Sequence, residues 1–266
     1  MRAGVVLLQA EVWLMLAVLL SGCAGQAARK TALPQPTETE AQWQPATAHP
    51  DYPALARDLI RQGHYAVALR QLDLAARADE SAAEPHYLRG VCQREIGDPA
   101  AARKSFQRAI RLDREYAPAY NGLGMMGFME RRYPEARKAL KKAVALNPAN
   151  PDYINNLGVL EMRTHRTPSA LARFEQCLRI APAYTKAKNN LAECLVRLGR
   201  NDAALAFLQH HFPPAVACNN LGAIYERIGY PSQARGMFLR ALVHDPGLAV
   251  ARRNLNRLET QENSQP

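Results

Sequence analysis

The chain has 266 residues, of which 48% are hydrophobic and 7% aromatic, and it carries a formal net charge of +10. A positive charge of this size can indicate binding to nucleic acid when it is concentrated on one face. Here the basic residues of the predicted helices are dispersed over outward faces and form no single run, so we expect no nucleic-acid partner. Examples are Arg103, Arg108, Arg137, Lys141 and Arg240.

The N-terminal segment has the pattern of a secretion signal. Met1-Arg2 gives a basic start, residues 5–20 are largely apolar apart from Glu11, and Leu20-Ser21-Gly22-Cys23 follows. This pattern resembles a bacterial lipoprotein signal peptide, which implies removal of residues 1–22 and acylation of Cys23. Ala24 resembles the residue after the cysteine in lipoproteins of the outer membrane, so we expect a lipid-anchored protein there, facing the periplasm. The alternative is an uncleaved signal anchor, but the segment is too short and too charged to span a bilayer comfortably.

Residues 23–48 are expected to form the acylated N-terminus and a flexible tether. The stretch from Gly25 to Pro50 is polar and contains Pro34, Pro36, Pro45 and Pro50, which disfavour a helix. Treated as a flexible chain, its ends would lie roughly 25–30 Å apart on average. Such a tether would let the following domain move near the membrane.

From residue 49 onward the sequence repeats. Three columns of small or apolar residues recur in register through six copies, with steps of 34 residues and one step of 30. The first column holds Ala56, Gly90, Gly124, Gly158, Ala192 and Gly222. The second, twelve residues later, holds Ala68, Ala102, Ala136, Ala170, Ala204 and Ala234. The third, four residues further on, holds Leu72, Phe106, Leu140, Phe174, Leu208 and Phe238. This spacing predicts two short helices in each copy that pack closely through small residues.

The sixth copy carries the fullest motif, with Leu221-Gly222, Tyr225, Ala234, Phe238 and Pro246. The motif resembles the tetratricopeptide repeat. The resemblance implies an all-α fold, a right-handed superhelical α-solenoid of about six repeats with a C-terminal capping helix. We place the repeats at residues 49–82, 83–116, 117–150, 151–184, 185–214 and 215–248, and the capping helix and tail at 249–266. Leu255 and Leu258 would cover the open end of the last repeat, while Arg252, Arg253 and Arg257 face water.

The fifth repeat is short. Its second helix meets Phe212-Pro213-Pro214, and the four missing residues correspond to about one helical turn. His211 stands in a column that otherwise holds alanine or Cys177, where a tight contact between small residues is expected. We therefore expect the solenoid to bend or loosen at this repeat.

The sequence carries no constellation typical of an enzyme. It has no Gly-rich phosphate loop, no His-Glu-x-x-His motif and no nucleophile elbow. His210 and His211 are adjacent on a predicted helix and point in different directions, so they do not readily share a metal. Cys92, Cys177, Cys194 and Cys218 fit small core positions, with a disulfide between Cys194 and Cys218 left open. We expect no enzymatic activity, no cofactor and no metal.

The first helices of such a solenoid line its concave groove, where we place the binding site. A ladder of asparagines follows the groove, made of Asn121, Asn155, Asn156, Asn189, Asn190, Asn219 and Asn220. An amide both donates and accepts, so the ladder is a candidate for holding an extended peptide backbone. The alternative is that these side chains simply join neighbouring helices.

An apolar strip lies beside the asparagines, made of Met125, Phe128, Met129, Val159 and Met162. Methionine suits partners of varied shape, and we nominate Phe128, Met129 and Met162 as anchors. Methionine and phenylalanine at helical spacing are also typical of a core, so the strip has two interpretations.

The lipoprotein motif, short tether and six repeats together resemble the pilotin lipoproteins of type IV pili and the related lipoproteins of Tad pilus loci. The resemblance implies a non-enzymatic scaffold in pilus or secretin assembly. Its partner would be an envelope protein, such as a secretin subunit or a pilus component, bound in the groove as an extended segment or a helix. Two alternatives stay open: an outer-membrane adaptor for peptidoglycan enzymes or a general envelope scaffold, and a regulatory subunit of an enzyme.

Overall fold

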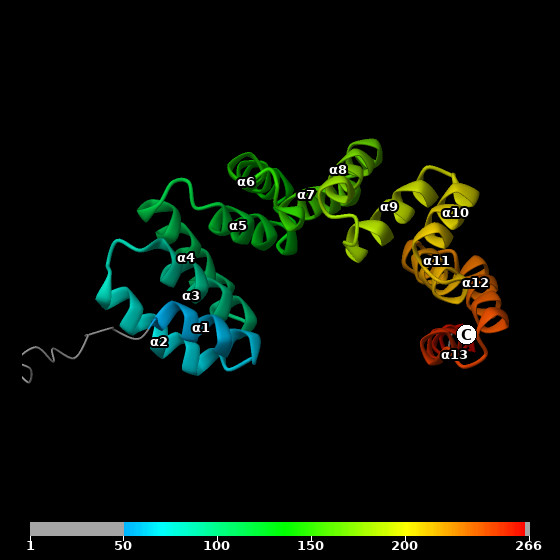
Figure 1. Cartoon of the computed structure of the whole chain (residues 1–266), viewed down its shortest axis with the longest axis horizontal. Helices are drawn as coiled ribbons and strands as arrows, with labels where there is room; N and C mark the ends of the chain where they lie inside the picture. The colour runs from blue at the N-terminus through cyan, green and yellow to red at the C-terminus, as the bar shows by residue number, and fades with distance from the viewer. Residues whose placement is uncertain (1–50, 264–266) are drawn as a thin grey trace, which may run out of the picture. The chain divides into compact units, whose positions relative to one another are not determined.

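The computed structural model describes residues 51–263, which lie in one compact unit, His49–Pro266. This part of the chain consists of thirteen α-helices and contains no strand, which confirms the predicted all-α fold (Figure 1). The helices are α1 (Tyr52–Arg61), α2 (Tyr65–Ala78), α3 (Ala83–Glu95), α4 (Pro99–Leu112), α5 (Ala117–Met129), α6 (Tyr133–Leu146), α7 (Pro151–Arg163), α8 (Thr167–Ile180), α9 (Thr185–Arg197), α10 (Asn201–His211), α11 (Pro214–Ile228), α12 (Pro231–His244) and α13 (Ala249–Asn263).

Local sequence explains where several helices begin. The Oδ1 of Asp98 accepts a hydrogen bond from the backbone N–H of Ala101 at 2.9 Å, and Pro99 opens α4 directly after this cap. Asn150 caps α7 in the same way, with Pro151 as its first residue. Proline fits this position because the first N–H groups of a helix have no partner within it.

The three repeating columns form the contact between the two helices of each repeat. Every alanine of the second column is fully buried. Phe106 and Phe174 of the third column press against Gly90 and Gly158 of the first, where an added Cβ would come within 2.7 Å of the ring. This close approach is why the first column holds only glycine and alanine, and it confirms the predicted register.

The helix pairs form a curved row. Each helix packs against the next one in the chain, and each odd-numbered helix also contacts the odd-numbered helices before and after it. Even-numbered helices of neighbouring repeats make no such contact within residues 51–263. The odd-numbered helices therefore lie on the inner side of the curve, as Figure 1 shows.

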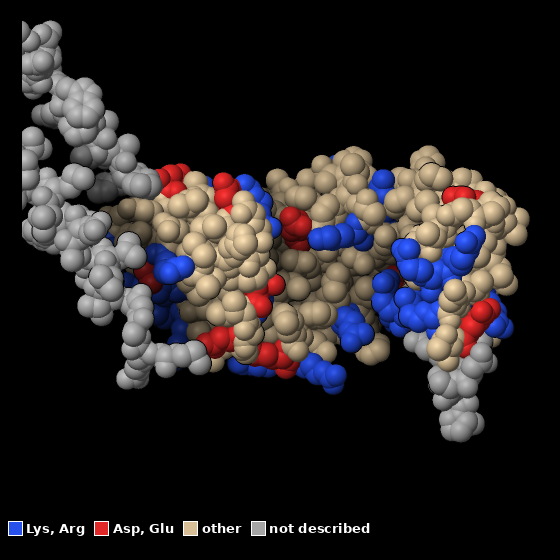
Figure 2. Space-filling view, turned by 90° about the horizontal axis from the view of Figure 1, so that it is seen from below, with Lys and Arg blue, Asp and Glu red and all other residues tan. Residues whose placement is uncertain are grey.

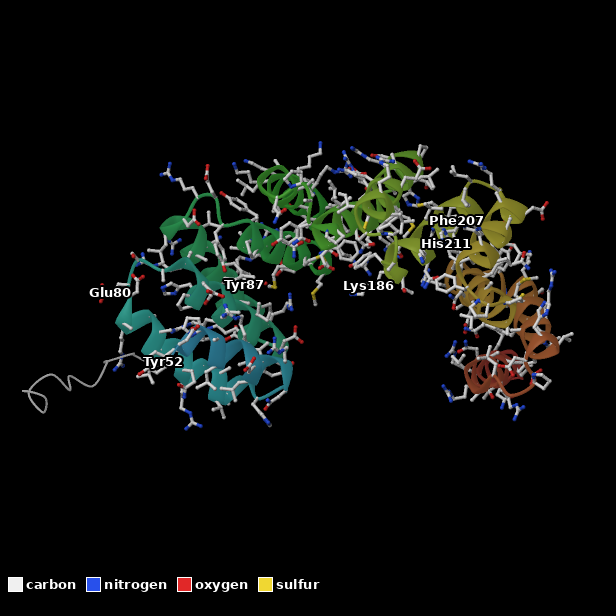
Figure 3. The ribbon with its side chains drawn as sticks, viewed as in Figure 1. Tyr52, Glu80, Tyr87, Lys186, Phe207 and His211 are labelled. Carbon is white, nitrogen blue, oxygen red and sulfur yellow. The ribbon has the colours of Figure 1, made fainter. Side chains whose placement is uncertain are left out.

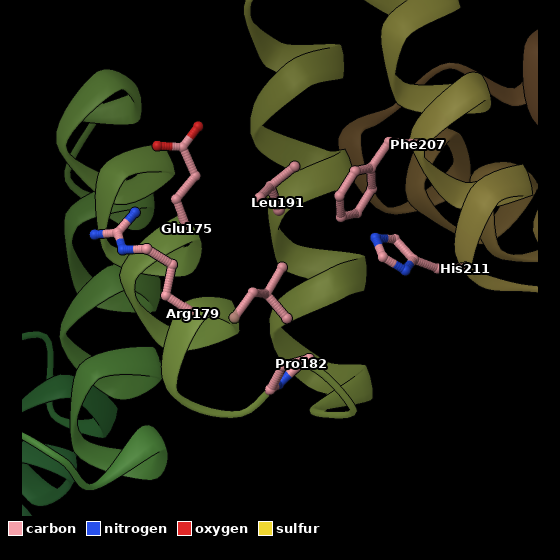
Figure 4. Close-up of a pocket in the computed structure, with 7 residues that line it drawn as sticks. Glu175, Arg179, Pro182, Leu191, Phe207 and His211 are labelled. Atoms are coloured by element: carbon pink, nitrogen blue, oxygen red, sulfur yellow. The ribbon is translucent and has the colours of Figure 1, made fainter.

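The second helix of the fifth repeat is shortened, as expected. This helix, α10, has 11 residues where α8 has 14. The ring of His211 cannot enter a small-residue contact and lies half-buried beside Phe207, with 4.6 Å between ring centroids. A cavity of about 330 Å³ remains between α8, α9 and α10 (Figure 4). It is lined by Glu175, Leu178, Arg179, Pro182, Leu191, Phe207 and His211.

The last helix, α13, covers the end of the sixth repeat. Leu255 and Leu258 are buried, at 8% and 3% exposure, whereas Arg252, Arg253 and Arg257 are exposed. The predicted capping helix is therefore present, and it continues to Asn263.

Two of the arginines expected to face outward instead join neighbouring repeats. Arg103 of α4 forms an ion pair with Glu130, which follows α5. Arg137 of α6 donates from Nη2 to the Oγ1 of Thr164, 2.7 Å away, after α7. Both arginines are half-buried, because the same position of successive repeats faces the turn of the next one. By contrast, Arg108, Lys141 and Arg240 are exposed.

Between residues 51 and 263, no helix combines the length and the apolar composition needed to cross a membrane. The predicted signal peptide, Cys23 and the tether lie outside the described residues.

Candidate functional site

Asparagine side chains connect the inner helices in a ladder. The Nδ2 of Asn156 donates to the Oδ1 of Asn121 at 3.0 Å, and the Nδ2 of Asn190 donates to the Oδ1 of Asn155 at 2.9 Å. The same bond joins Asn220 to Asn189 at 3.2 Å and Asn254 to Asn219 at 3.0 Å. Each rung therefore links an odd-numbered helix to the next one, which agrees with the second interpretation of these residues.

The ladder crosses the shortened fifth repeat without a break. Its rungs join asparagines 35 residues apart, except Asn189 and Asn220, which are 31 apart and lie on either side of α10. The missing residues thus come from the outer helix α10 and from the connection that follows it, and not from the inner helices. The inner helices keep their alignment, so the inner face continues through this repeat.

Each rung also leaves groups for a ligand. The Nδ2 of Asn121 and the Oδ1 of Asn156 take no part in the rung and form no hydrogen bond with the described residues. They supply one donor and one acceptor, the pair that a peptide group requires. Asn155 and Asn219, at 5% and 7% exposure, lie much deeper. The rungs between α9 and α11 and between α5 and α7, whose asparagines are all half-buried, are therefore the more accessible ones, and the rung between α5 and α7 is the one that opens into a cavity.

A polar cavity of about 410 Å³ surrounds this rung on the inner side of α3, α5, α7 and α9. Tyr87 and Lys186 lie toward the inner side at its two ends (Figure 3). A space-filling view toward the inner side shows a hollowed surface, with basic side chains gathered over the C-terminal helices (Figure 2). The lining residues are Tyr87, Val91, Arg94, Phe106, Asn121, Gly122, Asn150, Asp152, Tyr153, Asn156 and Lys186.

The cavity offers hydrogen-bond donors, acceptors and both signs of charge. Lys186 is exposed, and the exposed carboxylate of Asp152 accepts a hydrogen bond from the hydroxyl of Tyr184. Burial raises the pKa of Tyr87 and of Tyr153, so both hydroxyls stay neutral and able to donate at neutral pH. This mixture of polar and charged groups offers contacts for a polar ligand.

The apolar strip is separate from this cavity. Met129, the last residue of α5, is 67% exposed, whereas Met125 is half-buried. Phe128 is half-buried and packs on Tyr133, with 6.2 Å between ring centroids. Of the three nominated anchors, Met129 is thus the most accessible.

Met162 and Val159 belong largely to the core. Met162 is 6% exposed, and its Sδ lies 3.7 Å from the Sγ of Cys194. Val159 packs against the same cluster of buried residues. The physical reason is that α9 packs alongside α7 and covers these positions. The structure therefore does not place Met162 on an open apolar face beside Met129.

Among the cavity residues that the sequence did not nominate are Tyr87, Asp152, Tyr153 and Lys186. The spacing held one signal, because Tyr87 precedes Asn121 by 34 residues and Asn155 by twice that distance. It therefore occupies the repeat position of the predicted ladder. The other three required knowledge of which helix ends meet on the inner side.

The four cysteines of the described chain are free and buried, so Cys194 and Cys218 form no disulfide. Burial raises the thiol pKa of Cys92 and Cys177 to about 11 and that of Cys194 to about 12. Such thiols are unreactive at neutral pH. No group of three or more potential metal ligands occurs among the described residues. His210 and His211 contact each other edge to face, with centroids 4.9 Å apart.

Paired helices in a curved row, with a ligand-sized cavity on the inner side, define a helical-repeat protein of the interaction-scaffold class. The chain belongs to the tetratricopeptide repeat family. Three family models described as tetratricopeptide repeat match it, the first over residues 54–117 and 93–151, the second over 161–228 and the third over 217–250. Proteins of this fold are generally non-catalytic and bind a peptide or protein partner in the groove.

Several solved structures share the fold. PilF of Pseudomonas aeruginosa is 20% identical over 79% of this chain and 96% of its own, with a TM-score of 0.60. YrrB, described as a TPR protein with an unusual peptide-binding site, is 22% identical over 68% of this chain and 96% of its own, with a TM-score of 0.52. MamA from Desulfovibrio magneticus is 21% identical over 61% of this chain and 92% of its own, with a TM-score of 0.53. No protein of curated function matches the sequence.

Proposed function

We propose that this protein is a membrane-anchored interaction scaffold whose inner groove holds a segment of an envelope protein. The observation that carries the proposal is the polar cavity around Asn121 and Asn156, which is lined by four successive odd-numbered helices. A site shared by four repeats suits a ligand that crosses them. The free donor of Asn121 and the free acceptor of Asn156 suit a peptide backbone.

The size of the site suits an extended segment. Packed helices lie roughly 8–10 Å apart, so four neighbouring helices span about 25–30 Å. An extended chain covers this distance with about eight residues. Tyr87 at one end and Lys186 at the other supply different side-chain contacts, which would set the direction of the bound segment.

The finer proposal is a role in pilus or secretin assembly at the outer membrane. It is supported by the motif Leu20-Ser21-Gly22-Cys23, by Ala24, and by the likeness in fold to PilF. In this proposal Cys23 carries the lipid anchor. Replacement Cys23→Ala is expected to block processing or to release the protein into the soluble periplasm. Unchanged outer-membrane fractionation of this variant would rule out the anchor.

Binding of a partner in the inner groove can be tested by a substitution that blocks the polar cavity. Lys186→Trp places a large ring at the mouth of the cavity without touching the core, because Lys186 is exposed. Lys104→Trp on α4 is the matched control, since Lys104 is also exposed and lies on an outer helix. We expect Lys186→Trp to weaken binding of the natural partner at least about tenfold, and Lys104→Trp to leave it unchanged. Calorimetry with the partner recovered from its cells measures both values.

The recovered partner also separates the candidate roles. A secretin subunit or pilus component supports the assembly role, whereas a murein hydrolase supports the adaptor alternative. If the wild-type protein recovers no envelope protein, or if both tryptophan variants bind equally well, the groove proposal is wrong.

A further inference from the structure

The turns that join the two helices of each repeat share one backbone conformation. Their first or second residue has a positive φ in all six repeats, and in four of them it is a glycine: Gly63, Gly97, Gly199 and Gly229. In the third and fourth repeats it is Arg131, at φ 59°, and His165, at φ 58°. The next N–H bonds back to the preceding helix in each case, as from Arg132 to the carbonyl of Gly127 at 2.7 Å. These are therefore equivalent turns.

The left-handed backbone conformation at positions 131 and 165 is unfavourable for residues that carry a side chain. A left-handed conformation suits glycine, whereas a residue with a Cβ is strained there. Four sister turns show that glycine satisfies the fold. Both Arg131 and His165 are exposed, and neither forms a side-chain hydrogen bond or ion pair with the described residues, so packing does not account for them.

Further arginines lie beside the equivalent turns. Arg163 and Arg166 flank the turn of the fourth repeat and Arg200 that of the fifth; all three are exposed and form no ion pair within residues 51–263. Arg197 is held in place, because its Nη2 lies 2.7 Å from the Oε1 of Glu193, a carboxylate with 3% side-chain exposure. We call the group formed by Arg131, Arg163, His165, Arg166 and Arg197 the basic edge.

The basic edge contains a small cavity with an apolar floor. The cavity has a volume of about 240 Å³ and is lined by Tyr133, Met162, Arg163, His165 and Arg197. Met162 is buried beneath it. The cavity thus combines cationic groups at its mouth with space for one aliphatic side chain below.

We propose that the basic edge binds an acidic segment of a protein partner. Carboxylates of the segment pair with Arg131, Arg163 and His165, and one apolar side chain enters the cavity over Met162. The inference rests on the proposed function as a protein-binding scaffold and adds the chemistry of the partner. Guanidinium groups without a partner match carboxylates well, because their planar N–H groups bind two oxygens at once.

Charge complementarity favours an acidic peptide over a nucleic acid. Glu130 and Glu135 flank Arg131 and Arg132 on the same edge, so the positive surface is interrupted by carboxylates. A phosphate backbone would meet these carboxylates along its length. A peptide can place isolated acidic side chains between them, with an apolar side chain at the cavity.

The test measures binding of a labelled twelve-residue model peptide with alternating glutamate and leucine, using fluorescence anisotropy and the full chain. A matched peptide carries glutamine in place of glutamate. The first variant, Arg131→Gly with His165→Gly, adopts the residue that the sister turns use, so it is expected to fold. The second is Arg163→Gln with Arg166→Gln. The control is Arg108→Gln with Arg111→Gln, which removes two exposed arginines from the outer helix α4.

We expect the glutamate peptide to bind the wild type and the control equally well. Each basic-edge variant should bind it at least about tenfold more weakly, with little binding of the glutamine peptide to any protein. The proposal is overturned if the wild type does not bind, if the control loses as much affinity as the variants, or if only a single-stranded oligonucleotide or anionic vesicles bind. Lys186→Trp should leave this peptide unaffected, so failure of the groove and failure of the basic edge are distinguishable.

Discussion

At the scale of single residues, the contact between the first and third columns sets how closely the two helices of a repeat approach. Gly90, Gly158 and Gly222 each face a fully buried phenylalanine, and Gly124 faces Leu140. The rings and the glycines are complementary in size. A larger residue in the first column must displace a ring that has no free space.

We predict that Gly158→Ala destabilises the protein by about 1–3 kcal/mol, the usual cost of overpacking. Its Cβ would lie 2.7 Å from the ring of Phe174. Gly236→Ala is the control, because Gly236 lies on the exposed side of α12 and an added Cβ there meets no atom within 4 Å. The control is expected to be neutral or stabilising by up to about 1 kcal/mol. Urea denaturation of both variants measures the difference, and equal stabilities would show that the close contact is not rigid.

At the scale of elements, the turns of the third and fourth repeats carry strain that the other turns lack. We predict that Arg131→Gly and His165→Gly each stabilise the protein by about 0.5–1 kcal/mol, because relief of backbone strain exceeds the added entropy of glycine in the unfolded chain. The reverse change, Gly97→Arg, should destabilise the protein, because position 97 has a left-handed φ of 84°. An added Cβ there meets no atom within 4 Å, so the loss would come from the backbone conformation alone. Chemical denaturation measures all three, and a loss of stability in Arg131→Gly would mean that this side chain supports the fold.

The shortened helix α10 makes stability depend on pH through His211. Burial, followed by the positive charges of Lys188 and His210, lowers the pKa of His211 in the folded protein. The unfolded state therefore binds more protons near and below the unfolded pKa of about 6.5, so the free energy of unfolding falls as the pH falls from about 7 to 5. His86 contributes in the same direction, because its pKa is also lowered by burial.

We predict that His211→Ala, which restores the residue found in most sister repeats, reduces this loss of stability. Thermal unfolding of wild type and variant at pH of about 7.5 and 5 gives the comparison. The same pH dependence in both proteins would show that His211 does not titrate in the way its surroundings indicate.

At the scale of the whole molecule, repetition explains why the fold was predictable and the site was less so. The contact of Gly158 with Phe174 joins two columns that recur in six copies, and its structure follows from the spacing. The asparagine positions were equally visible, but their hydrogen bonds run between repeats and needed the structure. Met162 shares a predicted face with Met129, yet the neighbouring helix α9 covers it. Spacing within a helix does not show what packs against it.

The polar cavity around Asn121 and Asn156 and the cavity of the basic edge also depend on contacts between repeats. Tyr87 and Lys186 are almost 100 residues apart in sequence and line one site only because four helices meet there. The basic edge left a clearer trace, since Arg131 and His165 interrupt a column of glycines at regular spacing. That column could have been recognised from the sequence. The cavity beside it could not have been recognised in this way, because its floor is formed by Met162, a buried residue that does not belong to the column of glycines.

Binding of a protein segment in the inner groove can be measured by site-specific photo-crosslinking in cells that produce the protein naturally. A photoreactive residue at position 186 lies at the mouth of the polar cavity. The matched position is Val243, which is 80% exposed on the outer helix α12. We predict a discrete crosslinked partner at position 186 and none at position 243. Crosslinks to the same protein at 243 but not at 186 would contradict the account, because the partner would then bind the outer surface.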